Sequence, residues 1–418
     1  MSHMDGVTKL ADPVGVEASP RPVAQPLRVA QVITGLSAGA GGITLRGALA
    51  LDRELYSTAI LAAEGGTLLD RAEDAGLEVI RLRHMSTGRG VYPWNDGRAF
   101  KEVASHLAAG DFDLVHTHSA KAGALGRIAA RRVGVRTVVH SFHGFPFHEF
   151  QSPLVRGGLR AIERWLAGMT DYFLTDGTVV AAEAVRLKIA PPDRIRAIAS
   201  PVDENIAPVS QATRREARRL LGIPERAKVI GTAGRLNGQK APLDMVKAVA
   251  GMGRDDVYVV WAGDGPLRKK MERLIERSGL RDRFLLLGER KDVPALLPGF
   301  DVFAMSSLFE GLPCAVVEAM TCGIPVVATA VNSVPEIVVS GKTGLVAKPG
   351  NPVSLGRALA YVLDHPREAA RMAGAARSHI GSRFLPEVLG QDLHEAYEIA
   401  VRVSSAPVLS TATAVAVR

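Results

Sequence analysis

The chain carries two successive series of short apolar segments, and stretches with helical periodicity separate the segments of each series. The segments lie at 28–33, 58–62, 78–82, 114–118, 137–140 and 172–175 in the first series, and at 228–233, 258–262, 284–287, 302–305 and 325–328 in the second. Strands that alternate with helices form parallel sheets covered by those helices. The pattern therefore predicts two parallel α/β sheets, and ligands of such sheets bind beyond the carboxyl ends of the strands.

The length of the chain, 418 residues, suffices for two domains that each have a core of their own. We expect a first domain at 28–203, a second domain at 204–385 and a final helix at 386–403. Residues 1–27 and 404–418 are expected to be disordered tails, because the first is rich in Pro and Ala and the second in Ser, Thr, Ala and Val. Met1–Met4 resembles a cloning remnant.

The composition is that of a globular protein, since 47% of the residues are hydrophobic and 22% are charged. No apolar run approaches the roughly 20 residues that span a bilayer. No secretory signal is visible, and the only cysteines, Cys314 and Cys322, have no partner spacing for zinc. Two cysteines in so long a chain fit a reducing compartment, so we expect a cytoplasmic protein.

The net charge of +8 raises the question of an anionic partner. Nucleic acid is not expected, because no helix-turn-helix, zinc-finger or RNA-binding signature occurs. An evenly solvated basic surface is the simplest interpretation. Two alternatives are phosphorylated sugars and peripheral contact with an anionic membrane. Two basic segments could make the membrane contact, one with Lys121, Arg127, Arg131, Arg132 and Arg136 and the other with Arg156, Arg160 and Arg164.

Two acids, Glu310 and Glu318, stand in an otherwise apolar stretch with seven residues between them. Apolar residues at helical spacing predict a helix that begins near Leu312, with Pro313 in its first turn. Glu310 would then lie in the loop before the helix, and Glu318 about two turns further along. A buried carboxylate needs hydrogen-bond donors, and sugar hydroxyls supply them. The alternative is a helix-entry acid favoured by the helix dipole and a solvated or ion-paired Glu318.

Arg235 and Lys240 lie in the loop that follows the first strand of the second series. Arginine can bind two phosphate oxygens at once, and lysine adds a mobile point charge. Fixed cations in this place would stabilise a departing diphosphate without a metal. The alternative is a solvated turn.

The loops after strands of the first series hold glycines and histidines. Gly41 and Gly42 belong to a Gly-rich loop whose amides could approach a phosphate or a sugar. His118 ends the segment 114–118, on the same face as His116. His143 precedes a glycine in the loop after the next strand, where aromatic side chains suit a sugar or a cyclic acceptor.

Two features suggest a metal, but neither has the pattern of a metal site. Asp111 and Asp113 form an Asp-x-Asp pair at the amino end of their strand, which is the wrong end. His140, His143 and His148 have steps of three and five residues on an aromatic loop, which is not a known zinc pattern. We expect no metal and no cofactor.

These motifs together resemble those of the retaining glycosyltransferases of family four, whose signature is the Glu-x7-Glu pair. The resemblance extends from about Arg28 to the end of the C-terminal helical region. It implies the GT-B fold, in which two Rossmann-like domains face each other across a cleft and the C-terminal helix crosses back onto the first domain.

The resemblance also implies roles for individual residues. Glu310 would contact hydroxyls of the transferred sugar, His118 would lie beside that sugar, and Arg235 and Lys240 would hold the diphosphate. Glu318 would bind the ribose. The remaining residues that we assign to the donor are Gly41, Gly42, Gly311, Leu312, Pro313 and Arg290, and those that we assign to the acceptor are His143 and Phe145.

The resemblance implies a retaining, metal-independent transfer of a sugar from a nucleotide diphosphate, expected to be UDP, to an acceptor in the first domain. Two alternatives stay open: a nucleotide-sugar epimerase of the same fold and a non-catalytic subunit that binds sugar nucleotides. The acceptor could be an antibiotic aminocyclitol, a lipid-linked glycan or a small thiol precursor.

Overall fold

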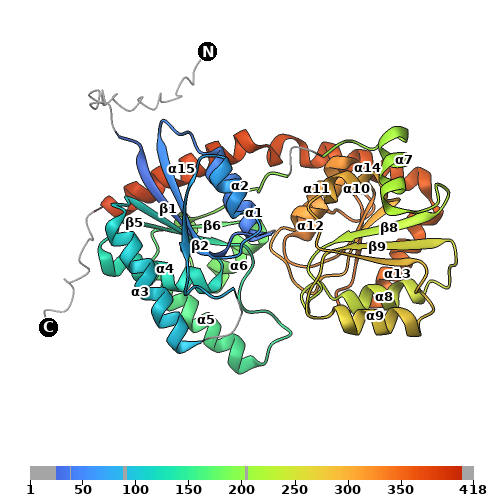
Figure 1. Cartoon of the computed structure of the whole chain (residues 1–418), viewed down its shortest axis with the longest axis horizontal. Helices are drawn as coiled ribbons and strands as arrows, with labels where there is room; N and C mark the ends of the chain where they lie inside the picture. Colours follow the sequence, from blue (N-terminus) through green and yellow to red (C-terminus); the bar gives the residue numbers. More distant parts are fainter. Residues whose placement is uncertain (1–24, 38, 88–91, 203–205, 407–418) are drawn as a thin grey trace, which may run out of the picture.

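The computed structural model describes residues 25–37, 39–87, 92–202 and 206–406. These residues form two parallel α/β domains that lie side by side (Figure 1). The first β-strand already begins at Leu27 and the last helix continues to Ser405, so the expected tails are too long by one and two residues. The rest of both tails, with the expected cloning remnant, and the expected domain boundary at 203–204 lie outside the described residues.

The first domain contains a seven-stranded parallel sheet with the strand order β3-β2-β1-β4-β5-β6-β7. Its strands are β1 (Leu27–Gly35), β2 (Tyr56–Ala63), β3 (Glu78–Leu82), β4 (Leu114–His118), β5 (Thr137–Phe142), β6 (Tyr172–Thr175) and β7 (Ile195–Ala197). Its helices are α1 (Ala40–Ala50), α2 (Leu69–Asp74), α3 (Pro93–Ala109), α4 (Ala120–Val133), α5 (Pro153–Ala167) and α6 (Thr178–Arg186).

The second domain contains a six-stranded parallel sheet with the strand order β10-β9-β8-β11-β12-β13. Its strands are β8 (Lys228–Ala233), β9 (Val257–Ala262), β10 (Phe284–Gly288), β11 (Val302–Met305), β12 (Val326–Thr329) and β13 (Leu345–Ala347). Its helices are α7 (Gln211–Leu221), α8 (Pro242–Ala250), α9 (Arg268–Arg277), α10 (Val293–Leu296), α11 (Cys314–Cys322), α12 (Val334–Ile337), α13 (Pro352–Asp364) and α14 (Pro366–Ile380).

The predicted fold is confirmed, and each expected apolar segment forms a strand of these sheets. The central strands are apolar on both faces because helices cover both sides of a parallel sheet. In each sheet the strand order reverses at the first strand, so β1 lies between β2 and β4, and β8 lies between β9 and β11. The carboxyl ends at these reversals are the places where ligands bind in sheets of this kind.

The last helix, α15 (Pro386–Ser405), leaves the second domain and crosses the first (Figure 1). Its residues Leu389, Leu393 and Tyr397 belong to one buried cluster with Val29 of β1 and Val139 of β5. Residues near the end of the described chain therefore form part of the core of the first domain.

The two domains contact each other along their facing edges. The carboxylate of Glu336, just before the end of α12, accepts hydrogen bonds from the backbone N–H groups of Thr178 and Val179 at 3.0 and 2.9 Å. These residues begin α6, whose first N–H groups have no partner within the helix. On the same side, the rings of His148 and Phe309 stack with centroids 4.0 Å apart.

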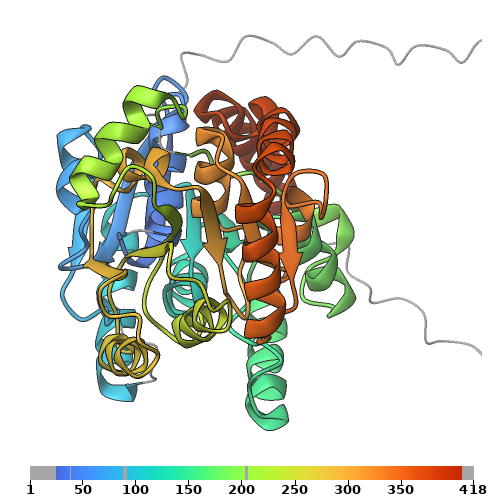
Figure 2. The same cartoon turned by 90° about the vertical axis from the view of Figure 1, so that its right-hand side faces the viewer.

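None of the helices in the described part of the chain is long and apolar enough to cross a membrane. Helix α5 projects from the lower edge of the first domain (Figure 2).

Candidate active site

Glu310 follows β11, and its buried carboxylate is surrounded by donors. Its Oε1 accepts hydrogen bonds from Lys240 Nζ at 2.6 Å and from Ser307 Oγ at 2.5 Å, and its Oε2 accepts one from Gln239 Nε2 at 3.2 Å. The N–H of Glu310 donates to Asn332 Oδ1 at 2.9 Å. The carboxylate is thus fixed at the carboxyl end of the second sheet, as the sequence predicts, but it is bonded to Lys240.

The two cations of the loop after β8 are placed differently. Lys240 forms the ion pair with Glu310 and is mostly buried. Arg235 is exposed, and its side chain makes no hydrogen bond or ion pair with any described residue. Its donors are therefore available to a ligand.

Helix α11 begins at Cys314, two residues later than the sequence predicts. Pro313 is the N-cap residue instead of a first-turn residue, because its backbone is extended, with φ −77° and ψ 108°. Glu318 is half-buried and lies about one turn into the helix rather than two. Leu312 and Gly311 are buried in the preceding loop.

Gly311 brings the second domain against the first. A Cβ atom at this position would lie 2.9 Å from the backbone carbonyl of His143 and 3.1 Å from Asp176 Oδ2, so only glycine fits. From the other side, a Cβ atom on Gly144 would lie 3.4 Å from the nitrogen of Gly311. The loop that carries Glu310 therefore touches the loop that carries His143.

Gly41 and Gly42 lie inside the first turn of α1 and are buried, so the expectation that they form part of the preceding loop is wrong. Residue 38, in that loop, lies outside the described residues. A Cβ atom on Gly41 would lie 3.0 Å from the backbone of Leu36, so this glycine allows the helix to begin close to the end of β1.

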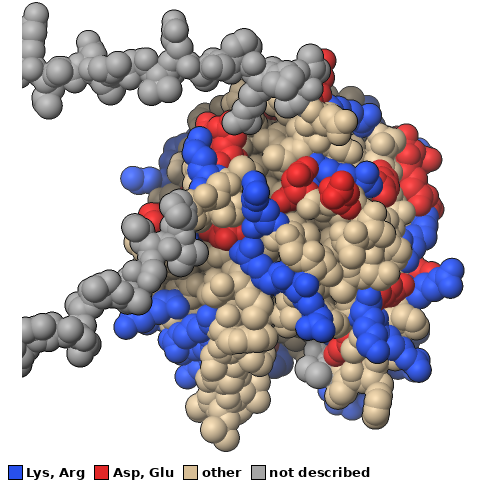
Figure 3. Space-filling model, turned by 90° about the vertical axis from the view of Figure 1, so that its left-hand side faces the viewer, with Lys and Arg blue, Asp and Glu red and all other residues tan. Residues whose placement is uncertain are grey.

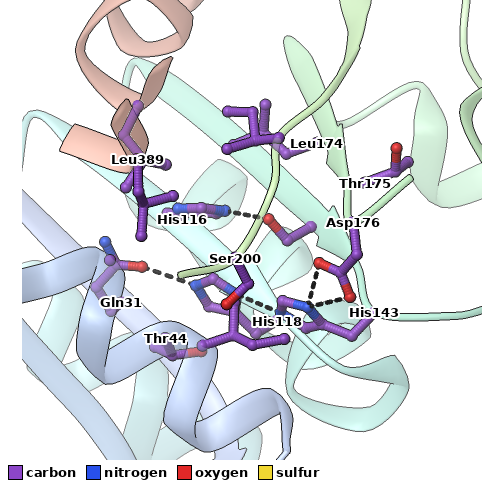
Figure 4. A pocket seen from close by; sticks show the side chains of 15 residues that line it. Gln31, Thr44, His116, His118, His143, Leu174, Thr175, Asp176, Ser200 and Leu389 are labelled. Carbon is purple, nitrogen blue, oxygen red and sulfur yellow. Dashed lines mark hydrogen bonds and ion pairs between the residues drawn. The ribbon is translucent and has the colours of Figure 1, made fainter. Parts of the chain in front are cut away.

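A hydrogen-bonded series in the first domain consists of four side chains, Asp176, His143, His118 and Gln31 (Figure 4). His143 Nδ1 lies 3.0 Å from Asp176 Oδ1, and His143 Nε2 lies 3.0 Å from His118 Nδ1. The rings of His118 and His143 stack at 5.3 Å. His118 Nε2 lies 2.7 Å from Gln31 Oε1, so both nitrogens of His118 have partners within the protein.

The series continues beneath His118 into the core of the first domain. Gln31 Nε2 lies 2.9 Å from the hydroxyl of Tyr397, and that hydroxyl lies 2.8 Å from His116 Nδ1. His116 Nε2 lies 2.7 Å from Ser141 Oγ. His116 and His118 share one face of β4, as the sequence predicts, with ring centroids 4.1 Å apart.

Burial determines the charge of these histidines. It lowers the pKa of His116 to about 3, and it lowers the pKa of His118 well below the usual value, with neighbouring histidines adding to the effect. Burial and the nearby charge of Arg127 also hold the pKa of His140 well below its usual range. All three imidazoles are therefore uncharged at neutral pH.

A small cavity lies beside this cluster (Figure 4). It measures about 30 Å³, which is enough room for water. Its walls include His118 at the end of β4, His143 and Asp176 in the loops after β5 and β6, Thr44 from α1 and Leu389 from α15. The pocket therefore lies between these histidines and the crossing helix.

The other predicted contacts have local partners. Phe145 is half-buried, and its ring stacks on Phe147 at 4.7 Å, so most of it belongs to the core. Arg290 pairs with Asp292 at 2.5 Å on the surface after β10. Asp113, of the rejected Asp-x-Asp pair, accepts a hydrogen bond from the N–H of Arg28 at the amino end of β4. Among the described residues, no group of three or more His, Cys, Asp or Glu side chains is placed to hold a metal ion.

One basic segment differs from the expectation of a free basic surface. Arg127 is fully buried and pairs with Glu163 at 2.9 Å. Lys121 forms an ion pair with Asp96 at 3.0 Å, and Arg131 forms one with Asp171 at 2.7 Å. These cations hold α4 against its neighbours, so a run of basic residues is a poor guide to the surface here.

Several residues of the site carry no signal in their own sequence neighbourhood. Asp176 could have been found, since it is a polar residue directly after a strand, the position that supplied the other candidates. Gln31 lies within the apolar β1, and Tyr397 lies on α15, 366 residues away. No local pattern connects these two.

Comparison with known proteins agrees with this architecture. The family profile "Glycosyl transferase 4-like domain" matches residues 38–201, and "Glycosyl transferases group 1" matches residues 213–379. The chain is 31% identical over 306 residues to the UDP-Gal:alpha-D-GlcNAc-diphosphoundecaprenol alpha-1,3-galactosyltransferase of Escherichia coli, covering 71% of this chain and 77% of the relative. The chain belongs to the family 4-like glycosyltransferases.

Another similar glycosyltransferase is the 2-deoxystreptamine glucosyltransferase of Streptomyces kanamyceticus, with 34% identity over 280 residues, covering 62% of this chain and 69% of the relative. Among solved structures, Anabaena HepE in complex with UDP-glucose has a TM-score of 0.75 at 20% identity, covering 89% of this chain and 99% of HepE. A sucrose-phosphate synthase from Thermosynechococcus elongatus gives the same TM-score at 19% identity, with 89% and 98% coverage. These likenesses show the GT-B fold of this glycosyltransferase.

Proposed function

We propose that this glycosyltransferase transfers a sugar from a UDP-sugar to an acceptor in the first domain, with retention of configuration and without a metal ion. One observation carries the proposal: the buried, hydrogen-bonded carboxylate of Glu310 lies where the second sheet meets the His143 loop of the first. The relatives support the choice of donor, because one is named for UDP-Gal and HepE binds UDP-glucose.

In the proposed reaction, the acceptor hydroxyl bonds to the anomeric carbon on the face from which the diphosphate departs. The carbon–oxygen bond to the diphosphate breaks as the new bond forms, and the hydroxyl proton passes to the departing phosphate oxygen. Positive charge develops on the sugar ring, and the Glu310 carboxylate would stabilise it. Arg235 and Lys240 would hold the diphosphate, and Glu318 the ribose. Gly41 and Gly42, Gly311, Leu312 and Pro313, and Arg290 would form the rest of the donor site.

The acceptor side of the proposed site is the wall formed by His118 and His143, with Phe145 behind it. Both nitrogens of His118 are already bonded, so we assign it to shaping the wall beside the sugar. Because its imidazole is uncharged, it does not repel the positive charge of the transition state.

The direct test is a screen of UDP-sugars, with release of UDP measured with and without candidate acceptors such as 2-deoxystreptamine, D-inositol 3-phosphate and a lipid-linked N-acetylglucosamine. We expect one donor to release UDP, faster with its acceptor, and NMR to show the donor's anomeric configuration in the product. A change of configuration at C2 of the sugar would identify an epimerase instead. Donor binding with no turnover for any acceptor would indicate a binding subunit.

Arg235→Ala is expected to weaken UDP binding about tenfold while uridine binding is unchanged, because a charged hydrogen bond to phosphate is worth about 1.5–3 kcal/mol. Calorimetry with UDP and uridine measures both affinities. Arg277→Ala is the matched control, since Arg277 is an exposed arginine of α9. Unchanged UDP affinity in Arg235→Ala would contradict its placement on the diphosphate.

Turnover is expected to survive excess EDTA, because Lys240 and Arg235 would supply the positive charge that the departing diphosphate needs. The measurement is the initial rate before and after chelation. Loss of activity that magnesium or manganese restores would show that the leaving group depends on a metal ion.

We also propose that α5 docks the first domain on an anionic membrane. Its side chains Leu154, Ile162 and Trp165 are exposed by 89%, 49% and 58%, and they form one apolar face at helical spacing. Arg156, Arg160 and Arg164 recur every fourth residue along its flank. In Figure 3, an uncharged protrusion at the lower edge has basic side chains on both sides. An apolar helix face beside basic residues, with a tryptophan, is typical of contact with anionic lipid.

Vesicle co-sedimentation tests this contact. Ile162→Glu is expected to abolish binding to vesicles with anionic lipid, whereas Val353→Glu, at a 62% exposed position of α13 in the second domain, should not. Binding of the unaltered protein should fall with salt. If Ile162→Glu instead changes only the oligomeric state, α5 is an interface between copies of the chain.

A further inference from the structure

The buried polar residues beneath His118 come from distant parts of the chain. Gln31 lies on β1, His116 on β4 and Tyr397 on α15, and they are 2%, 2% and 1% exposed. A buried amide or hydroxyl is costly unless it is hydrogen-bonded, and apolar residues of similar size would fill this core without that requirement. Three such groups in contact below an active-site histidine indicate a role other than packing.

The order of donors and acceptors in this series can be worked out from its fixed end. The Asp176 carboxylate can only accept, so His143 Nδ1 must donate to it. In an uncharged His143, Nε2 is then an acceptor, and His118 Nδ1 must donate to it. In an uncharged His118, Nε2 is left as an acceptor. With one proton on each ring, the group of Gln31 that faces His118 Nε2 is therefore the NH₂ group.

In the structure the Gln31 amide has the opposite orientation, with Oε1 toward His118 and Nε2 toward Tyr397. In that orientation His118 Nε2 donates to Oε1, and the cluster needs one extra proton: either His118 is doubly protonated, or His143 carries the second proton against the Asp176 carboxylate. Turning the amide by 180° exchanges two groups of nearly equal size and removes the need for that proton. The hydroxyl of Tyr397 then donates to Oε1, His116 Nδ1 donates to the hydroxyl, and Ser141 donates to His116 Nε2.

We propose that Gln31 and Tyr397 are positioning residues: Tyr397 orients the Gln31 amide so that its NH₂ group donates to His118 Nε2, which keeps that imidazole uncharged beside the transferred sugar. The catalytic part rests on the proposed function, which places His118 there. An imidazolium in this place would oppose the positive charge that develops on the sugar. Helix α15 thereby contributes to the site through a side chain that never touches the substrate.

The groups that face His118 support this assignment. His116, His140 and His143 lie around it from β4, β5 and the following loop, and Asp176 acts on it through His143. From the side of α15, burial holds the pKa of Tyr397 well above its usual value, so this residue is a neutral phenol that can donate. Arg127 lies beyond His140 and disfavours further positive charge.

The test removes the hydroxyl and leaves the ring. In Tyr397→Phe we expect a roughly tenfold fall in kcat at neutral pH with little change in the donor KM. We also expect the acid limb of kcat to move to higher pH by about one unit, because the freed amide can offer its oxygen to a protonated His118. Gln31→Glu should move the acid limb further, since a carboxylate beside Nε2 favours the charged ring.

Tyr56→Phe is the matched control. The hydroxyl of Tyr56 bonds to His394 of α15 at 2.8 Å, so this variant removes a bond to the same helix. It keeps the Tyr56 ring, which packs edge-on against Tyr397 with centroids 5.7 Å apart. It should lower the melting temperature without moving the pH profile. If Tyr397→Phe and Gln31→Glu keep the unaltered acid limb, or if Tyr56→Phe shifts it equally, the positioning role is wrong.

A readout that needs no turnover separates this inference from the proposed function. NMR titration of ring-labelled histidines in the unliganded protein should show His118 uncharged down to low pH, and more readily protonated in Tyr397→Phe. Such a result would stand even if the UDP-sugar screen found no transfer. An unchanged His118 titration in both variants would overturn the inference even if transfer is confirmed.

Discussion

Glu310→Gln is expected to lower kcat by a factor of about 100 or more, with a smaller change in the affinity for UDP. Removing one preorganised electrostatic group from the place where charge develops typically costs 10²–10³ in kcat. The Glu310 carboxylate is buried and held by Lys240 and Ser307, so it requires little reorganisation as the sugar ring gains charge. The amide has nearly the same shape but lacks the negative charge.

Glu318→Ala is the comparison for this experiment. Glu318 would bind the ribose, and ribose contacts are about the same before and during the reaction, so its loss should mainly raise the donor KM. Steady-state kinetics of both variants, with UDP affinity from calorimetry, separates the two effects. A near-normal kcat in Glu310→Gln would leave Glu310 as a structural partner of Lys240.

Arg127→Met is expected to be the most destabilising of the substitutions considered, by about 3–5 kcal/mol, because it leaves the buried carboxylate of Glu163 without its partner. The side chains of the two residues are 0% and 4% exposed. Arg127 also donates to the carbonyl oxygen of Gly123 within α4. The free energy of unfolding, from denaturant titration, measures the loss.

Arg186→Met provides the control on the same domain. Arg186 pairs with Glu183 on the surface of α6, at 67% and 32% exposure, and exposed pairs contribute at most about 1 kcal/mol. A similar small loss in Arg127→Met would mean that the core relaxes around Glu163 or admits water to it.

The fold could be predicted from the sequence because apolar segments of a parallel sheet are distinct from the helices around them. The strands that the pattern does not reveal, β7 and β13, lie at sheet edges and have three residues each, too few for a periodic signal. The predicted start of α11 was two residues too early, because a proline such as Pro313 is compatible both with the first turn of a helix and with its N-cap. Local propensity does not separate these two.

The candidate site was predictable where a residue lies at the end of a strand or in the loop after it, as His118, Glu310 and Arg235 do. The contact between Glu310 and Lys240 was not predictable, because it joins loops after two different strands. The expectation that the basic residues of α4 form a free surface was wrong for a related reason. Periodicity places Arg127 on one face of the helix, but it does not show that α5 covers that face with Glu163.

The passage of α15 over the first domain has a consequence for the biosynthesis of the chain. A ribosome releases residues in order, and domains usually fold as they emerge. Here the sheet of the first domain lacks one side of its buried cluster until Leu389, Leu393 and Tyr397 have been made. The core of the nascent first domain therefore stays incomplete, with β1 and β5 only partly covered, while the whole second domain is translated. A polypeptide cut between the domains would keep the strands of the first sheet but lose the helix that closes its core.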